Sequence, residues 1–456
     1  MKQKVGNESI HDVLERMLLV FSPKYGLANS LIIEEMVHKK IKRPNCGTFT
    51  LGNVIPMYRT TVESSKVPWI IGCGAALTKE KSQIKAFGEF IERYCATNYM
   101  NDHNIKLYYN TFEEQSKCGD CLNPRELIDF NDNTNLRNDS EFSVYSDNSM
   151  VSWIIGTEET EGKTVWIPAQ KVFLGMPFIN GEQMYMQLIS TGLACGSTYY
   201  DAMLGSLYEV IERDSFMLTW LLRLPSKRIV VDSFKNRELQ ELYSHITNNL
   251  VGEDELLIYD ISQTDGIYTI LTFIRNSNLS SFGLITSSAA DIDPECALLK
   301  SLEELCLTQG YAYYILYENE DAKDSIAEMK VSDVTSLGNH IKYYGTGNRS
   351  DEFDFLDVTN ASINLSDMCR CQTLLDKKES ALYVIELLKK QNLSVFTVDV
   401  TRQEIMECGL FTIKTIIPGY NDLDNSHNSR LIANKRLLDL KKKYNVSINN
   451  APHPFP

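Results

Sequence analysis

A motif that occurs twice, E-x-I-E-R, constrains the fold of this chain more than any other feature. The two copies are Glu89, Glu92 and Arg93, and Glu209, Glu212 and Arg213. An apolar segment and a turn of small residues precede each copy, at 70–76 and at 188–196, and a weaker third copy runs from 283 to Glu304. Because internal repeats indicate repeated structural units, the sequence predicts three strand–turn–helix units in one large domain of the mixed α/β (α+β) class.

The length of the chain and the span of the repeats together predict its domain organisation. The chain has 456 residues, 43% of them hydrophobic, so it can bury a sizeable core. Length alone predicts roughly two to three domains, but the repeats extend from residue 70 to residue 310 and favour one intertwined unit. We expect an N-terminal lead-in at 1–64 and a single domain at 65–456 that includes the proline-rich C-terminal end.

Hydrophobic periodicity predicts the elements outside the repeats. We expect a helix near 10–18, a hairpin of 151–156 with 164–168, paired strands at 256–261 and 268–274, and strands at 394–400 and 411–417. A further helix is expected near 377–391, and a basic helix that Ser429 caps and that ends near Tyr444. The segment 129–147 is rich in Asn, Asp and Ser, which is typical of a surface loop.

Composition excludes several classes of partner. The net charge of −15 argues against a nucleic-acid partner. No apolar run approaches the ~18 residues of a membrane span, and the N-terminus does not resemble a signal peptide. The eleven cysteines, an odd number scattered along the chain, favour reduced thiols and a cytoplasmic protein. Cys118 and Cys121 form a lone C-x-x-C pair, for which free thiols are favoured over zinc.

A helical wheel gives each E-x-I-E-R helix an apolar face and an acidic face. In residues 82–96, Phe87, Phe90 and Ile91 lie opposite Glu89 and Glu92, and in residues 202–218 the glutamates likewise lie opposite the apolar positions. If these faces converge with the third unit, five carboxylates meet, and each close pair repels by about 4 kcal/mol near a protein surface. Mg²⁺ is the cation that this arrangement favours, because it takes carboxylate and phosphate oxygens. The predicted metal ligands are Glu89, Glu92, Glu209, Glu212 and Glu304.

Other interpretations of the same residues were weighed. A single E-x-x-E-R helix is most often a solvated face with a weak Glu–Arg pair, but two matched copies and a third partial copy favour a site. Residues 72–77 lack the third glycine of a dinucleotide fingerprint, and no Walker-type phosphate loop is present. Each histidine is expected to be structural, with His453 set apart because it lies near the chain end.

The last five residues contain three prolines, Pro452, Pro454 and Pro456. Proline fixes the backbone and keeps such a segment stiff and extended. This tail could therefore be inserted elsewhere in the fold, and its deletion is expected to cost little stability.

These motifs resemble those of the YcaO family, and more narrowly those of the stand-alone D-protein of azoline-forming cyclodehydratases in streptolysin S-like and microcin B17-like pathways. The resemblance covers roughly residues 65–456. It rests on both E-x-x-E-R helices, on a G-x-A-x-G turn, on an A-L-x-x-[AS]-x-x-E helix and on the proline-rich end. The residues that match the last three are Gly192, Ala194, Gly196, Ala297, Leu298, Ser301, Glu304, Pro452, Pro454 and Pro456. Where many members carry Ser, this chain has Lys85, and Thr191 and Leu307 also depart from the family pattern.

The resemblance implies a YcaO-type fold around a central site in which glutamates hold Mg²⁺ and the metal holds the phosphates of ATP. The implied cofactor-binding residues are Lys85, Glu89, Glu92, Arg93, Glu209, Glu212, Arg213 and Glu304. The implied reaction cyclises Cys, Ser or Thr residues of a ribosomally made precursor peptide to thiazoline or oxazoline, with phosphorylation of the backbone amide oxygen. Pro452, Pro454 and Pro456 are placed in the catalytic tail, with the terminal carboxylate as a proton acceptor.

The resemblance also implies partners. The chain shows no leader-binding domain of the kind fused in longer homologues, so we expect a separate E1-like, leader-binding C-protein. A flavin-dependent dehydrogenase that acts afterwards and a homodimer are left open. Two alternatives also stay open: amide activation for another nucleophile, as in thioamidation, and a non-catalytic scaffold subunit.

Overall fold

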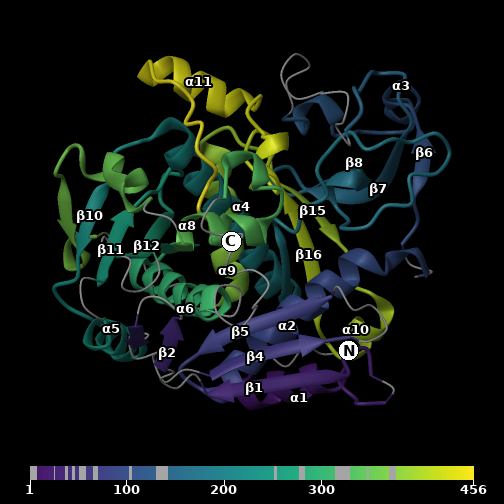
Figure 1. Cartoon of the computed structure of the whole chain (residues 1–456). Helices are drawn as coiled ribbons and strands as arrows, with labels where there is room; N and C mark the ends of the chain where they lie inside the picture. The colour runs from purple at the N-terminus through teal and green to yellow at the C-terminus, as the bar shows by residue number, and fades with distance from the viewer. Residues whose placement is uncertain are drawn as a thin grey trace.

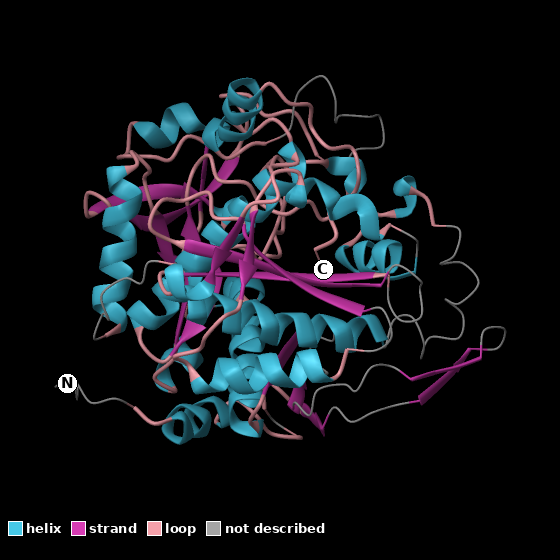
Figure 2. Cartoon of the chain, turned by 90° about the vertical axis from the view of Figure 1, so that its left-hand side faces the viewer, coloured by secondary structure: helices cyan, strands magenta, loops and turns pink. Residues whose placement is uncertain are grey.

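The computed structural model describes residues 8–24, 26–35, 40–43, 47–50, 58–64, 70–101, 105–129, 142–250, 254–276, 283–313, 329–346, 349–368 and 376–455. The fold mixes helices with mainly antiparallel sheets, and the magenta strands of Figure 2 run through the interior with cyan helices around them. The predicted mixed α/β class is therefore confirmed.

The N-terminal part forms a three-stranded sheet with strand order β1-β4-β5 and a separate two-stranded ribbon. Figure 1 shows this sheet in purple and blue at the bottom of the molecule, with α1 and α2 beside it. Because β4 pairs with β5, residues on both sides of the predicted boundary at 64 share one sheet. The elements are α1 (Ile10–Leu18), β1 (Ser30–Glu35), β2 (Lys40–Arg43), β3 (Gly47–Thr50), β4 (Tyr58–Glu63), β5 (Ile71–Ala76) and α2 (Lys79–Thr97).

A second sheet has the order β6-β7-β15-β16-β9, with β8 paired to β7. The predicted hairpin is thus confirmed as β7 and β8, which pair antiparallel. Helix α4 packs against β9 and β16, and α9 packs against α4. The elements are β6 (Tyr108–Asn110), α3 (Phe112–Ser116), β7 (Val151–Glu158), β8 (Lys163–Pro168), β9 (Leu193–Gly196), α4 (Tyr199–Leu222), α9 (Lys377–Lys390), β15 (Phe396–Asp399), α10 (Gln403–Glu407) and β16 (Phe411–Ile416).

A third sheet has the order β13-β12-β11-β10-β14, and α6 packs against β12 and β13. The predicted pairing of 256–261 with 268–274 is confirmed in β11 and β12. The elements are β10 (Lys227–Val230), α5 (Arg237–Asn248), β11 (Asp254–Asp260), β12 (Tyr268–Asn276), β13 (Leu284–Asp291), α6 (Pro294–Tyr313), α8 (Leu337–Thr346), β14 (Ser362–Asn364) and α11 (Lys435–Tyr444).

The three predicted strand–turn–helix units are β5–α2, β9–α4 and β13–α6, and each helix begins at a polar cap. The side chains of Thr78, Thr198 and Asp293 accept hydrogen bonds from the first-turn amides of α2, α4 and α6, as N-terminal caps do. Glycine in the first unit has a steric reason: a Cβ on Gly72 would lie 2.1 Å from the Ala86 carbonyl oxygen. The small-residue turns therefore let each helix lie directly on its own strand.

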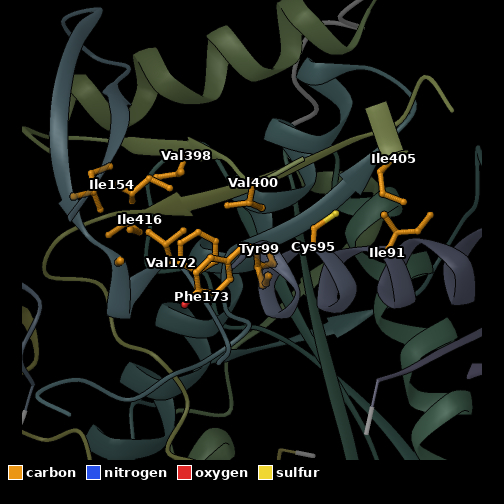
Figure 3. Packing of buried hydrophobic residues seen from close by; sticks show 14 of the residues in the cluster. Ile91, Cys95, Tyr99, Ile154, Val172, Phe173, Val398, Val400, Ile405 and Ile416 are labelled. Carbon is orange, nitrogen blue, oxygen red and sulfur yellow. The ribbon is translucent and has the colours of Figure 1, made fainter. Parts of the chain in front are cut away.

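One large apolar core joins the first unit to the second sheet. Ile91, Cys95 and Tyr99 on one side of α2 and its C-terminal extension face residues of β15 and β16 in Figure 3. The Tyr99 and Phe173 rings stack with centroids 3.6 Å apart. This packing explains why a helix at residue 90 and strands near residue 400 form one body.

One local prediction was wrong, and another was confirmed only in part. The basic helix α11 is capped by Asn434, whose side chain accepts from the amides of Arg436 and Leu437, while Ser429 lies in a separate 3-10 turn. The expected surface loop at 129–147 has no helix or strand in its described part, 142–147; Val144 is 59% exposed there, whereas Asp129 and Tyr145 are 6% and 8% exposed, and 130–141 lie outside the described residues. Composition identified the polar segment, but tertiary packing decided where it is exposed.

Candidate active site

The first glutamate of each E-x-I-E-R motif binds the backbone at the start of its own unit. Glu89 accepts a hydrogen bond from the amide of Cys73 in β5, and Glu209 accepts one from the amide of Gly192 just before β9 at 3.3 Å. Glu89 also pairs with Arg93 at 2.5 Å, one helical turn away. Glu89 thus forms the Glu–Arg pair expected of a solvated helix face, but Glu89 and Glu209 also bind the backbone of the segments that precede their helices.

The second glutamate of each motif reaches the next unit. Glu92 on α2 accepts from the amide of Cys195 in β9 at 2.9 Å. Glu212 on α4 accepts from the Ser288 hydroxyl in β13 at 3.0 Å. The third unit returns to the first, because Glu303 on α6 accepts from Lys85 on α2 at 2.7 Å.

These three contacts close a circle of units. The packing of the elements follows the same order, with α2 against β9, α4 against β13 and α6 against β5. The circle brings the acidic faces of the three helices toward one another. We call Glu89, Glu92, Glu209, Glu212 and Glu304 the carboxylate set.

The pKa values of the carboxylate set show that its members interact electrostatically. Desolvation by burial, together with the neighbouring Glu209 and Glu89, holds the pKa of Glu92 well above its usual range. Burial raises the pKa of Glu212 to about 7, with Arg213 opposing and Glu209 adding to the shift. Burial and the charge of Glu89 also raise the pKa of Glu304, against Lys85 and Arg213. A carboxylate with such a pKa lacks enough positive charge nearby.

Solvent nevertheless reaches the carboxylate set. The side chains of Glu89, Glu209 and Glu212 are 31%, 24% and 13% exposed. Glu304 is exposed as well, although nearby protein atoms desolvate its carboxylate. Groups that are both desolvated and accessible can exchange water for an incoming cation.

Two positively charged side chains, Lys85 and Arg213, lie beside the carboxylate set. Although burial lowers it, the pKa of Lys85 is raised overall by Glu303 and Glu304, so its charge is retained. The Arg213 guanidinium has two nitrogens, Nε and Nη1, that are buried without a hydrogen-bond partner. Nη1 lies 3.6 Å from Glu212, and the guanidinium stacks over the Phe455 ring at 4.2 Å. Buried donors without acceptors are costly, so these N–H groups fit an anion such as phosphate.

The residues present fit Mg²⁺ and a phosphate-bearing ligand in their chemistry: carboxylate oxygens for the metal, and free guanidinium donors for phosphate oxygens. Among the described residues, no group of three or more His, Cys, Asp or Glu side chains is arranged to hold a metal ion. The carboxylates bind backbone amides, Ser288 and arginines instead. The assignment of the five glutamates as metal ligands stays a prediction.

The C-terminal tail lies along α4. Trp220 donates from Nε1 to the Ala451 carbonyl at 3.3 Å. The Phe216 ring lies 4.8 Å from the Phe455 ring, and Arg213 covers Phe455. Since Trp220, Phe216 and Arg213 succeed one another toward the helix N-terminus, the tail runs toward Glu212 and Glu209. Figure 1 marks the chain end near the centre of the molecule, beside α4.

The tail is buried, which corrects the expectation that its deletion costs little stability. Phe455 is 5% and His453 2% exposed, and both belong to the interior. Pro452 and Pro454 are buried as well, whereas Pro456 lies outside the described residues. The catalytic assignment of Pro452, Pro454 and Pro456 stays a prediction, but the direction of the tail agrees with it.

His453 is a neutral structural side chain. Its Nε2 contacts the Asp424 carbonyl at 2.8 Å, and its ring stacks on His340 with centroids 3.9 Å apart. Burial, then the neighbouring His340 and Arg213, hold its pKa well below the usual value. An imidazole of this kind donates one hydrogen bond and carries no charge at neutral pH.

Sequence reasoning missed Lys414, which lies in β16 and is 1% exposed. Its ammonium donates to the carbonyls of Ile189 and Thr191 at 2.8 and 2.6 Å, and so holds the turn whose Gly192 amide binds Glu209. Burial lowers the pKa of Lys414 to about 8. A single lysine inside the apolar run 411–417 was the signal that could have identified it.

A small recess is lined by Thr191 and Thr415, among others. It is lined by the buried ion pair of Lys171 and Asp422 and by Asp129, whose pKa burial raises to about 7. No member of the carboxylate set lines it. It is therefore separate from the candidate active site.

A comparison with known protein families agrees with this arrangement of three acidic helices. The family model described as YcaO cyclodehydratase, ATP- and Mg²⁺-binding, matches residues 73–421. The chain belongs to the YcaO family. The match spans all three units and both E-x-x-E-R motifs, so ATP and Mg²⁺ are the cofactors of this family member.

Solved structures share the fold. A heterocyclase in complex with substrate and cofactor superposes with a TM-score of 0.73 at 18% identity, and the match covers 100% of this chain and 58% of that one. The YcaO protein of Methanopyrus kandleri, bound with AMPPCP and Mg²⁺, gives 0.60 at 18% identity over 90% of this chain and 89% of that one. A chain of the E. coli microcin synthetase McbBCD complex with pro-MccB17 bound gives 0.56 at 17% identity, over 92% and 100%.

Two remaining predictions concern membranes and cysteines. In the part of the chain that the structure describes, no helix has the length and apolar character needed to cross a membrane. The cysteines within that part are free thiols, Cys118 and Cys121 among them. The choice of free thiols over zinc at that pair stays a prediction.

Proposed function

We propose that this YcaO protein is an ATP-dependent cyclodehydratase that converts Cys, Ser or Thr residues of a ribosomally made precursor peptide to thiazoline or oxazoline. The observation that carries the proposal is the meeting of the carboxylate set with Arg213 and the inserted tail on one face of α4. Family membership supports the ATP-dependent activation, and the heterocyclase neighbours support the class of product.

In the proposed reaction, a substrate side chain attacks the preceding amide carbonyl. The oxygen of the adduct takes the γ-phosphoryl group of ATP, and phosphate then leaves with that oxygen, so ATP and peptide become ADP, phosphate and the ring. Phosphoryl transfer needs mainly positioning and neutralisation of charge. Mg²⁺, when bound, supplies charge neutralisation at the phosphates.

The residues of the chain have separate roles in this proposal. Glu89, Glu92, Glu209, Glu212 and Glu304 bind the metal, and Arg213 donates its free N–H groups to phosphate oxygens. Lys85 and Arg93 flank the phosphates and keep the neighbouring glutamates in place. The terminal carboxylate of the tail accepts the proton that the cyclising group gives up.

The proposal includes partners. A precursor peptide is the substrate, and an E1-like, leader-binding C-protein is proposed to deliver it, in keeping with the multi-protein microcin synthetase that shares the fold. The flavin-dependent dehydrogenase and the homodimer stay predictions.

The first test is nucleotide binding to Glu212→Gln. Removing one carboxylate charge from the set should weaken Mg²⁺-dependent binding of a non-hydrolysable ATP analogue by at least about 100-fold, because the metal loses a charged oxygen ligand. Isothermal calorimetry with and without Mg²⁺ measures this. The matched control is Glu113→Gln, a glutamate in an exposed i,i+4 pair with Lys117, which should bind as the wild type does.

The second test is the reaction itself. The chain, a candidate C-protein and Cys-, Ser- and Thr-containing peptides are incubated with ATP, and the loss of one water per ring is followed by mass spectrometry. Ring formation that Glu212→Gln abolishes supports the proposal. Unchanged nucleotide affinity in Glu212→Gln would remove the metal role, and binding without ring formation for any peptide would favour the scaffold alternative.

A further inference from the structure

Three successive carbonyl groups of the tail are each bound by a different side chain. The Ala451 carbonyl accepts from Trp220 Nε1 at 3.3 Å, and the Pro452 carbonyl accepts from the Tyr344 hydroxyl at 2.6 Å. The His453 carbonyl accepts from His340 Nδ1. Because Pro452 and Pro454 have no N–H group, carbonyls are the main polar groups by which this segment can be held.

The three donors come from two helices that face the tail together. His340 and Tyr344 are four residues apart on α8 and therefore lie on one face of that helix. Trp220 lies on α4, and its ring meets the Tyr344 ring edge-on with centroids 6.1 Å apart. Trp220, His340 and Tyr344 are each at most 1% exposed, so the contacts are made out of reach of water.

We propose that Trp220, His340 and Tyr344 form a carbonyl clamp that sets how far the tail extends toward the carboxylate set. The inference rests on the proposed function, in which the end of the tail acts on substrate. The three side chains are positioning residues: they contact the tail and act on the reaction through it.

Packing alone does not require these donors. The cluster around the tail is apolar, and phenylalanine would fill the place of Tyr344 without a hydroxyl that must find a partner. A hydroxyl and an imidazole buried there are costly unless their hydrogen bonds are made. Each donor is matched to one carbonyl, so sliding the tail by one residue, ~3 Å in an extended chain, would break all three contacts.

The clamp binds the tail at residues 451–453, and residues of α4 contact it again at Phe455. Beyond the third carbonyl, Phe455 packs between Phe216 and Arg213. Arg213 also lies beside Glu212, at 3.6 Å. The position that the clamp sets for residues 451–453 thus also determines where Phe455 lies relative to Arg213 and Glu212.

The test compares two neighbouring tyrosines of α8. Tyr344→Phe removes the hydroxyl that binds Pro452 and keeps the ring, and we expect kcat for ring formation to fall at least about tenfold with unchanged affinity for the ATP analogue. The control is Tyr343→Phe, a tyrosine whose ring packs against Arg349, and it should keep kcat within about twofold.

A second pair of variants tests the imidazole donor. His340→Leu should lower kcat as Tyr344→Phe does, whereas His340→Gln, which retains an N–H donor, should restore part of it. A purely structural role predicts lower thermal stability in all these variants with kcat unchanged, and that result would overturn the clamp.

Hydrogen exchange separates failure of the clamp from failure of the proposed function. The amides of His453 and Phe455 should exchange at least about tenfold faster in Tyr344→Phe than in Tyr343→Phe, whether or not the protein forms rings. If the wild type forms no rings but the exchange difference is present, the proposed function fails and the clamp stands. If exchange is the same in both variants, the clamp is wrong.

Discussion

The carboxylate set and the C-terminal tail both lie along α4, yet the protein builds them in opposite ways. The carboxylates are reached by solvent and short of counter-charge, and burial raises the pKa of Glu92, Glu209 and Glu212. The described part of the tail carries no charge and is largely buried, and side chains bind three of its carbonyls. Without a ligand, the carboxylate set lowers the stability of the fold, whereas the packing of the tail raises it.

The largest expected effect on stability is at the tail. Phe455→Ala removes a ring that is 5% exposed and packed against Phe216 and Arg213. Such truncations typically cost about 3–5 kcal/mol, and urea unfolding should show a loss of this size. Leu438→Ala on α11, where the side chain is 42% exposed, should change the free energy of unfolding by less than about 0.5 kcal/mol. A loss below about 1 kcal/mol at Phe455 would mean that the tail is only loosely held.

The next effect is the response of the tail to pH. Burial lowers the pKa of His340 to about 4 and that of His453 well below its usual value of 6.5. Arg213 adds positive charge beside His453, His427 nearby has its own pKa lowered to about 4 by burial and Arg430, and Asp424 is the nearby acid. His340 and His453 bind protons more readily in the unfolded chain than in the folded one. Their contribution to the free energy of unfolding is therefore complete above pH ~6.5 and is lost as the pH falls toward 4. For His340 this loss amounts to up to about 3 kcal/mol.

Urea midpoints measured from pH 7.5 to 4.5 check this prediction, with His340→Leu as the comparison. Between these pH values the variant should lose less stability than the wild type, since it has one histidine fewer to protonate. An equal pH dependence in both proteins would show that other groups dominate acid unfolding.

The smallest expected effect on stability has the opposite sign and lies in the carboxylate set. Glu92→Gln keeps an oxygen that can accept from the Cys195 amide but removes a carboxyl group that burial and Glu209 make costly to ionise. We expect the metal-free protein to gain about 1 kcal/mol while Mg²⁺-dependent nucleotide binding is lost. Glu386→Gln, an exposed partner of Lys390, should leave both quantities unchanged. A destabilised Glu92→Gln protein would contradict the contrast between the two regions.

The difference between these regions also explains what sequence reasoning could predict. The acidic faces were predictable, because a 3.6-residue period and a repeated motif place Glu89, Glu92, Glu209 and Glu212 without knowledge of distant contacts. The third unit was harder: Glu304 was assigned, but Glu303 is the residue that pairs with Lys85.

The tail shows where local patterns stop being informative. Its prolines predicted an extended segment, but nothing near residue 452 indicates that donors more than a hundred residues earlier will bind it. Lys414 was missed for the same physical reason, since the carbonyl that it binds lies 223 residues earlier in the chain. The cap at Asn434 is a local contact with the amides of Arg436 and Leu437, and the choice of Ser429 overlooked it.

The circle of contacts from α2 to β9, from α4 to β13 and from α6 back to α2 has a consequence for synthesis of the protein. In an open array of repeats, early units can acquire their final neighbours as soon as they leave the ribosome. Here the first unit waits for the third, and α4 waits for the last residues of the chain. A nascent chain therefore cannot close the circle of units before α6 has been made, and it cannot pack the tail against α4 before residues 451–455 have been made.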